Sequence, residues 1–127
     1  MLFRSRFLAT IEPWHGEQVV VYFESGAGML WSRNVIDTSF RDGHALACAD
    51  LDGDGNDEIV AGFRGPGTSL YVYYAADSCG AQWERQMLDT EMAASGVAIA
   101  DLDGHGRPDV VAIGASTGDV KWYENLG

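Results

Sequence analysis

Two short acidic segments carry the residue types that bind a hard cation. The first, residues 50–58, reads Asp-Leu-Asp-Gly-Asp-Gly-Asn-Asp-Glu and has carboxylates at its first, third, fifth and ninth positions. Calcium takes six to eight oxygen ligands at roughly 2.3–2.6 Å, and alternating carboxylates with a backbone carbonyl can supply most of them. The segment therefore predicts a Ca²⁺ site, with Mg²⁺ as the alternative. The expected ligands are Asp50, Asp52, Asp54, the carbonyl of Asn56, and Glu58.

The second segment, residues 101–109, repeats this pattern 51 residues further along the chain. Its fifth position holds His105, and imidazole suits softer metals than calcium. We therefore expect this second site to be weaker, completed by water, or empty. Its candidate ligands are Asp101, Asp103, His105, the carbonyl of Arg107, and Asp109.

The residues around the first loop indicate what kind of site it is. A helix–loop–helix calcium site needs a bidentate Glu at its twelfth position, and here that position is Ala61. The flanking runs 45–49 and 58–63 are short and apolar, and the second is rich in β-branched residues, which predicts strands. We therefore expect a structural cation that joins two strands and neutralises clustered carboxylates. An acidic turn that binds no ion is the alternative.

Other residues share the period of the two loops. Tyr22, Tyr73 and Tyr123 recur 50–51 residues apart, and Trp31 and Trp83 are 52 apart. Four antiparallel strands in a repeat of about 40–50 residues are typical of a β-propeller blade, whereas the rival β-sandwich needs no such repeat. The predicted fold is all-β, with about two and a half blades and an incomplete ring. The predicted strands of one period are 45–49, 58–63, 69–74 and 83–88, and the predicted blades are 7–37 (partial), 44–89 (complete) and 95–125 (partial).

The two loops and the strands around them resemble FG-GAP (VCBS) repeats over residues 44–127. This resemblance implies a calcium-binding β-propeller and an extracellular or periplasmic location. The basic start of the chain is followed by an apolar stretch that is broken at Thr10 and Glu12, so we expect no signal peptide. Cys48, inside the run 45–49, is expected to be a small buried side chain.

A second polar group is expected at the opposite end of the blades. If the acidic loops join the first and second strands, the connectors between the second and third strands and between blades lie at the other end. An aromatic platform with hydrogen-bonding groups and an acid/base suits a polyhydroxylated ligand. Structural roles are the alternative: packing of Trp14 between blades, a backbone hydrogen bond from His44, or an ion pair of Arg64 with Glu12 or Asp42. The candidates are Glu12, Trp14, His15, His44 and Arg64.

A closer resemblance concerns residues 7–16, 43–46 and 58–64, which are similar to the propeller domain of aldos-2-ulose dehydratase-like proteins. It implies elimination of water from keto-sugars, with His15 or His44 as the proton-transfer group. Three hypotheses follow: a calcium-stabilised module that binds carbohydrate or protein, a protomer or fragment of a keto-sugar lyase, and a purely structural repeat.

Composition limits the partners. The chain of 127 residues has a formal net charge of −11, which disfavours nucleic-acid phosphates and anionic membranes. Two and a half blades would leave sheet edges open, which is an aggregation liability. We therefore expect several copies to complete a ring as a homo-oligomer, unless the chain is a fragment.

Overall fold

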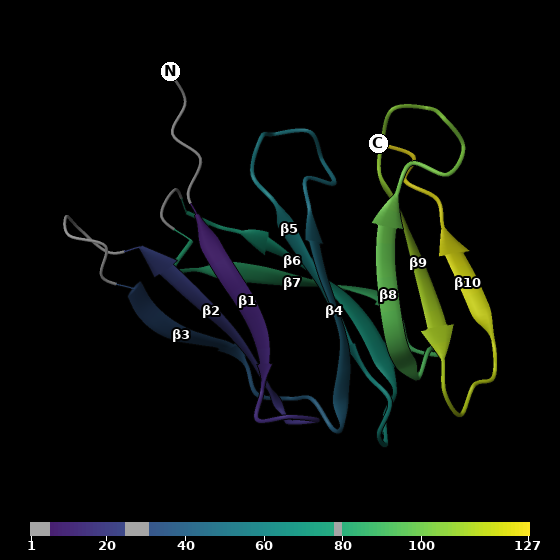
Figure 1. The fold of residues 1–127 in the computed structure, drawn as a ribbon, viewed down its shortest axis with the longest axis horizontal. Coiled ribbons are helices and arrows are strands. Elements are labelled where there is room, and N and C mark those ends of the chain that lie inside the picture. The colour runs from purple at the N-terminus through teal and green to yellow at the C-terminus, as the bar shows by residue number, and fades with distance from the viewer. Residues whose placement is uncertain (1–5, 25–30, 78–79) are drawn as a thin grey trace.

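The computed structural model describes residues 6–24, 31–77 and 80–127 as ten strands in three antiparallel sheets (Figure 1). The predicted all-β fold of incomplete blades is confirmed, and no sheet in the described chain closes into a barrel. None of the described residues forms a helix that could cross a bilayer. The strands are β1 (Phe7–Glu12), β2 (Gln18–Glu24), β3 (Trp31–Asp37), β4 (Gly43–Ala49), β5 (Glu58–Phe63), β6 (Ser69–Ala75), β7 (Trp83–Asp89), β8 (Ala94–Ala100), β9 (Asp109–Gly114) and β10 (Val120–Tyr123).

Each sheet is a blade whose strands follow one another in sequence. The orders are β1-β2-β3, β4-β5-β6-β7 and β8-β9-β10, and the first strands β4 and β8 lie side by side. Figure 1 shows both acidic loops at one end of the molecule, while the β1–β2 and β5–β6 turns lie at the other. The strand connectivity therefore separates the two groups of candidate residues, as the sequence predicts.

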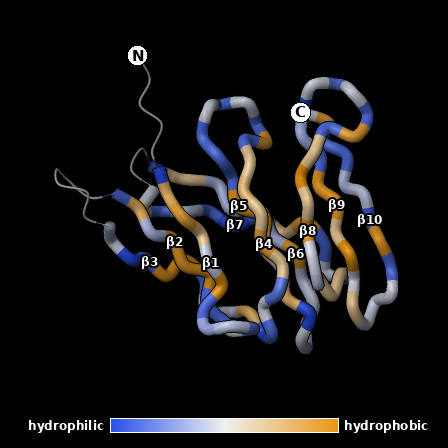
Figure 2. The backbone as a smooth tube through the Cα atoms, viewed as in Figure 1, coloured by the Kyte–Doolittle hydropathy of each residue, from blue (hydrophilic) through white to orange (hydrophobic). Residues whose placement is uncertain are grey.

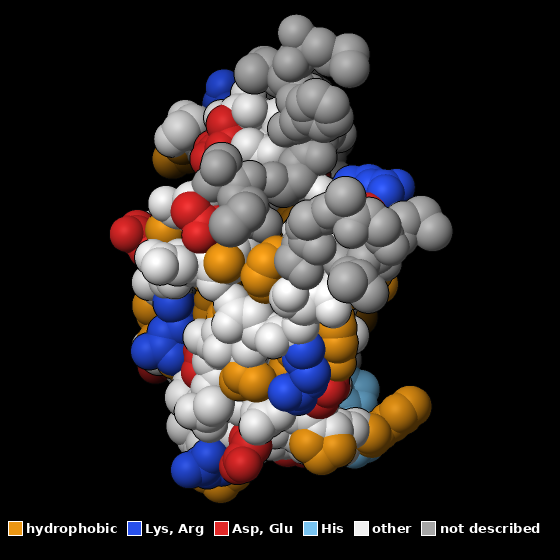
Figure 3. All heavy atoms as spheres, turned by 90° about the vertical axis from the view of Figure 1, so that its left-hand side faces the viewer, with side chains coloured by type: hydrophobic (Ala, Val, Ile, Leu, Met, Phe, Trp, Pro, Cys, Tyr) orange, Lys and Arg blue, Asp and Glu red, His pale blue; other side chains and the backbone are white. Residues whose placement is uncertain are grey.

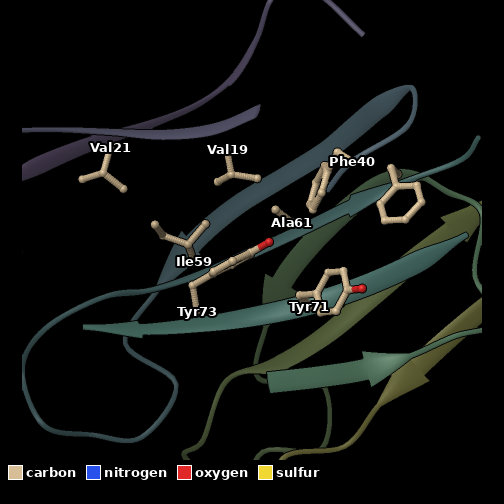
Figure 4. Close-up of a cluster of buried hydrophobic side chains, with 8 residues drawn as sticks. Val19, Val21, Phe40, Ile59, Ala61, Tyr71 and Tyr73 are labelled. Atoms are coloured by element: carbon tan, nitrogen blue, oxygen red, sulfur yellow. The ribbon is translucent and has the colours of Figure 1, made fainter. Parts of the chain in front are cut away.

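Two hydrophobic cores fill the spaces between neighbouring blades. The middle blade contacts both neighbours, so all six residues of β5 are buried. Figure 2 shows that β4, β8 and β9 are largely apolar whereas β3 and β7 carry many hydrophilic residues, and Figure 4 shows side chains of the first core. The first core contains Val19, Val21, Phe40, Ile59, Ala61, Phe63, Tyr71 and Tyr73, and the second contains Ala45, Val60, Leu70, Val72, Met92, Ala94, Val110 and Ala112.

Cys48 corrects one expectation, because its side chain is exposed. Side chains alternate along β4, so that Ala45 belongs to the second core while Leu46 packs against the first. Cys48 lies on the same side of β4 as Leu46. The first blade, which faces this side of β4, has three strands in the described part of the chain.

A repeated polar contact joins each blade to the next, and we call it the interblade tie. Asp37 ends β3 and accepts a hydrogen bond of 2.6 Å from the hydroxyl of Tyr73 in the second blade. Asp89 ends β7 and accepts a bond of the same length from Tyr123 in the third. The tyrosines and aspartates that recur in the sequence therefore pair with one another, the aspartate from one blade and the tyrosine from the next.

A cation completes each tie from a different strand. Arg85 of β7 lies 3.0 Å from Asp37, and its guanidinium sits 4.2 Å above the centre of the Tyr71 ring. Lys121 of β10 lies 2.9 Å from Asp89. Since Tyr123 repeats Tyr73, Lys121 occupies the place of Tyr71. The third blade thus supplies its cation from its third strand.

The first blade has the tyrosine and the arginine of a tie, but the carboxylate that they bind, Glu12, belongs to the same blade. Tyr22 repeats Tyr73, and its hydroxyl donates to Glu12 at 2.6 Å. Arg33, which repeats Arg85, lies 3.1 Å from the other oxygen of Glu12. This cluster therefore links strands within one blade, unlike the two interblade ties.

The Asp37 tie predicts part of the pH dependence of stability. Burial alone would raise the pKa of Asp37, but hydrogen bonds from Ser39 and Tyr73 outweigh it and hold the pKa below its usual value of 3.8. A carboxylate with a lowered folded pKa contributes stability above its unfolded pKa, and this contribution disappears as the pH falls through the folded value. We expect the unfolding free energy of the wild type to decrease below about pH 4 more than that of Asp37→Asn. Urea titrations from pH 7 to pH 2.5 measure this difference, and parallel curves would contradict it.

Candidate functional site

In the first acidic loop, backbone amides donate hydrogen bonds to side-chain carboxylates of the same loop. Both oxygens of Asp50 accept hydrogen bonds of 2.9 Å, from the amides of Gly53 and Gly55. The amide of Asp54 donates to Asp52 at 3.1 Å, and that of Asn56 donates to Asp54 at 2.8 Å. These bonds restrict the carboxylates of Asp50, Asp52 and Asp54. The predicted ligands Asp50, Asp52, Asp54 and Glu58 each offer an oxygen, and these atoms lie within 4.8 Å of one another.

Glu58 is the most unusual member of this cluster, because its residue is 2% exposed. It accepts hydrogen bonds from the amides of Leu51 at 2.6 Å and Asp52 at 3.2 Å. Burial and the nearby charges of Asp52 and Asp54 raise its pKa to about 7. Four converging carboxylates, one of them buried, are a donor set that fits a hard divalent cation such as Ca²⁺.

The second loop repeats this geometry. Asp101 accepts hydrogen bonds from the amides of Gly104 at 2.9 Å and Gly106 at 2.8 Å. Asp109 is buried, like Glu58, and accepts from the amide of Leu102 at 3.0 Å. Oxygens of the predicted ligands Asp101, Asp103 and Asp109 lie within 4.8 Å of one another.

His105 changes the chemistry of the second loop. Its Nδ1 lies 2.7 Å from Asp103, which raises the pKa of the imidazole. Glu124, just after β10, brings an oxygen to the same pair, so that ligand atoms of Asp103, His105 and Glu124 also lie within 4.8 Å of one another. No sequence motif marks Glu124, because it lies outside the two repeated acidic segments.

Asn125 connects the two loops and was also missed. Its side-chain amide donates to the carbonyls of Leu51 at 2.7 Å and Pro108 at 3.0 Å, one from each loop. Its backbone amide donates to Asp109 at 2.8 Å. Arg107 contacts the carbonyl of Asn125 through its Nε at 3.0 Å. The segment after β10 therefore links the two acidic loops by hydrogen bonds.

At the end opposite the acidic loops, the β1–β2, β3–β4 and β5–β6 connectors lie against one another, and we call them the platform. The amide of Gly43 donates to the carbonyl of Gly16 at 3.0 Å, and that of Gly65 donates to Arg41 at 2.8 Å. A Cβ on Gly65 would lie 2.4 Å from the Arg41 carbonyl oxygen, so this approach requires glycine. The platform brings together residues that are far apart in the sequence.

Four of the five predicted residues gather on this platform. The rings of His15 and His44 stack with centroids 4.9 Å apart, and the indole of Trp14 donates to Nε2 of His15 at 2.5 Å. Asp42 joins them, with Arg64 at 2.8 Å and Nδ1 of His15 at 4.0 Å. Figure 3 shows histidine side chains at this end of the molecule. We call Trp14, His15, Asp42, His44 and Arg64 the histidine cluster.

A β-bulge positions His44. The register of β4 against β5 shifts between Gly43 and Ala45, and β8 shifts in the same way around Ser95. The Nδ1 of His44 contacts the carbonyl oxygen of Ser95 at 2.6 Å, so Nδ1 must be its donating nitrogen. The histidine therefore ties two blades together, and its Nε2 is the nitrogen left to accept a proton or hydrogen bond.

Glu12 lies apart from the histidine cluster. Its carboxylate is bound on the outer face of the first blade, where hydrogen bonds from Thr10 and Tyr22 lower its pKa. The side-chain alternation of β1 directs it to the face that also carries Thr10.

The fold and the loops define a class: β-propeller-like repeat modules in which an acidic loop joins the first two strands of a blade. Residues 50–112, about half of the chain, match the model of the FG-GAP-like repeat family. This stretch is therefore an FG-GAP-like repeat, and the predicted family is confirmed over it. No curated protein matches the chain. The resemblance to the dehydratases stays a prediction.

Proposed function

We propose that the chain is a Ca²⁺-stabilised propeller module that binds a polyhydroxylated ligand at its histidine cluster. The proposed Ca²⁺ site rests on one observation: the carboxylate of Glu58 is buried and lies beside those of Asp50, Asp52 and Asp54. A cation there would hold the end of β4 against the start of β5 and neutralise carboxylates that otherwise repel one another. Its role is structural.

Calcium titration tests this proposal. A ligand present at 100 times its Kd stabilises the folded state by about 2.7 kcal/mol, so we expect Ca²⁺ to raise the melting temperature by several degrees and EDTA to reverse the rise. Asp50→Asn should remove most of this response. Asp57→Asn is the matched control, since it changes the same charge within the loop but lies outside the ligand cluster. An unchanged melting temperature in the wild type, or equal responses of the two variants, would contradict the proposal.

The ligand part rests on the shape and chemistry of the histidine cluster. Trp14 is 86% exposed and can stack on a sugar ring, while the paired Arg64 and Asp42 offer polar contacts. An open depression of about 320 Å³ lies beside His15 and His44. The proposed ligand is a carbohydrate, and a protein partner is the alternative.

The accepting Nε2 of His44 supports a second candidate, proton transfer in a keto-sugar lyase. Trp14→Ala should weaken glycan binding at least tenfold under either function. His44→Gln should only weaken binding if the protein is a binding module, but should abolish turnover if it is a lyase. Glycan-array binding and a keto-sugar elimination assay separate these outcomes, and unchanged behaviour of both variants would leave only a structural role for the cluster.

The predicted homo-oligomer also stays a proposal. The first and third blades each present a face that no other described blade covers. Light scattering on the intact chain, with Ca²⁺ and with EDTA, measures whether copies assemble.

A further inference from the structure

One peptide group in the first acidic loop is bound at both of its polar ends. This group joins Leu51 to Asp52, and its N–H donates to Oε2 of Glu58 at 3.2 Å. Its carbonyl oxygen accepts a hydrogen bond of 2.7 Å from the side-chain amide of Asn125. Because a peptide group is planar, its two ends cannot turn independently of one another. A planar unit therefore connects a candidate cation ligand with a residue that lies 74 positions after Leu51.

Asn125 is anchored to the third blade as well. A side-chain amide has two hydrogens to donate, and the second bond of Asn125 goes to the carbonyl of Pro108 at 3.0 Å. Its backbone N–H donates at 2.8 Å to Asp109, which is the first residue of β9 and is 1% exposed. Movement of Asn125 would therefore break hydrogen bonds to both the second and the third blade.

This contact does not follow the repeat. Tyr123 repeats Tyr73, so the residue of the middle blade that is equivalent to Asn125 is Ala75, which has no polar side chain. The interblade tie at Asp89 already joins the second and third blades at the end of β7. The Asn125 contact is therefore a further joint between the same two blades, placed beside the first acidic loop.

We propose that a cation in the first acidic loop tightens the joint at Asn125, and that Asn125 in turn raises the cation affinity of that loop. The coupling requires the Ca²⁺ site of the proposed function, in which Asp52 and Glu58 are ligands. A cation held by these side chains restricts the peptide group that adjoins Asp52 and contacts Glu58. A restricted carbonyl leaves less conformational freedom to lose when Asn125 docks on it.

Linkage makes this effect reciprocal, so that cation affinity and docking change by the same factor. Asn125 is thus a positioning residue, because it acts on the cation through a backbone group of the loop.

Calcium titration of a chain with one intact loop tests the coupling. Asp101→Asn removes one of the three carboxylates that converge in the second loop, so that binding at the first loop is measured by itself. In this background, we expect Asn125→Ala to weaken Ca²⁺ binding about fivefold in isothermal titration calorimetry. Leu126→Ala is the matched control, because Leu126 is the next residue and is 78% exposed. It should change the affinity by no more than about twofold.

Hydrogen exchange provides a readout that a merely structural asparagine would not change. The backbone amide of residue 125 is present with and without the substitution. In the Asp101→Asn chain, Ca²⁺ should slow exchange of this amide about fivefold, and Asn125→Ala should remove the slowing. Asp50→Asn should remove it too, although it leaves residues 124–127 unchanged, so the test does not depend on how well Asn125→Ala folds. Asp57→Asn should preserve it.

Three outcomes would overturn the proposal: equal Ca²⁺ affinity with and without Asn125→Ala, equal slowing of exchange in the two chains, or an equal loss of affinity in Leu126→Ala. Each of them leaves the Ca²⁺ site itself standing. If the wild-type chain binds no Ca²⁺, the proposed site is wrong, and the coupling with it.

Discussion

Replacing Phe40 with alanine should lower the free energy of unfolding by about 3–5 kcal/mol, the usual cost of deleting a fully buried phenylalanine ring. Phe40 is 0% exposed although it lies in the connection between β3 and β4. Its ring centroid lies 5.0 Å from that of Phe63 and 6.1 Å from that of Tyr71 (Figure 4). The side chain therefore fills the core between the first and second blades from a connecting segment. Urea unfolding measures the loss.

Leu8→Ala is the control for this prediction. Leu8 is 61% exposed on the outer face of β1, so its truncation should change the unfolding free energy by no more than about 0.5 kcal/mol. Equal losses for the two variants would show that the connecting segment is not part of the core.

Asp37→Asn should have the second large effect, a loss of about 2–3 kcal/mol at pH 7, because a buried hydroxyl and a guanidinium lose their ionic acceptor. Tyr73 is 1% exposed and cannot turn its hydroxyl to water, whereas Arg85 is half-exposed and can. Most of the loss should therefore come from the tyrosine. Chemical denaturation of the wild type and the variant at the same pH measures it.

The repeated tyrosines provide a matched control for the tie. Tyr73→Phe breaks a contact between blades, whereas Tyr22→Phe breaks the same kind of contact within one blade. The first should cost about 1.5–2 kcal/mol and the second less than about 1 kcal/mol, because the Tyr22 site is more exposed to water. If Tyr22→Phe is the costlier change, the tie does not contribute to blade docking.

The repeat made most of the fold predictable from the sequence. Recurring aspartates, tyrosines and tryptophans mark equivalent positions, so the four strands of the middle blade and the end of the molecule that holds the acidic loops follow from one alignment of the chain with itself. The alternation of side chains then separates the two cores. These features depend on local patterns that a single sequence contains.

The remaining features depend on contacts between segments far apart in the chain. Asn125 reaches Leu51, 74 residues away, and no motif marks it. Glu12 was expected beside His15 because Glu12 precedes, and His15 lies in, the connector at that end of the first blade, but strand alternation directs its carboxylate to Tyr22. The exposure of Cys48 depends on which strands cover β4, and an apolar run cannot report that.

The interblade ties have a direction, and this has a consequence for how such chains can evolve. The first and second blades each present a carboxylate at the end of their last strand, Asp37 or Asp89, and the blade that follows binds it through a tyrosine, Tyr73 or Tyr123. A duplicated unit of about 50 residues would therefore bring both halves of the contact with it. Gain or loss of whole units would preserve the joints on either side, so the number of blades in a lineage could change without new contacts having to arise.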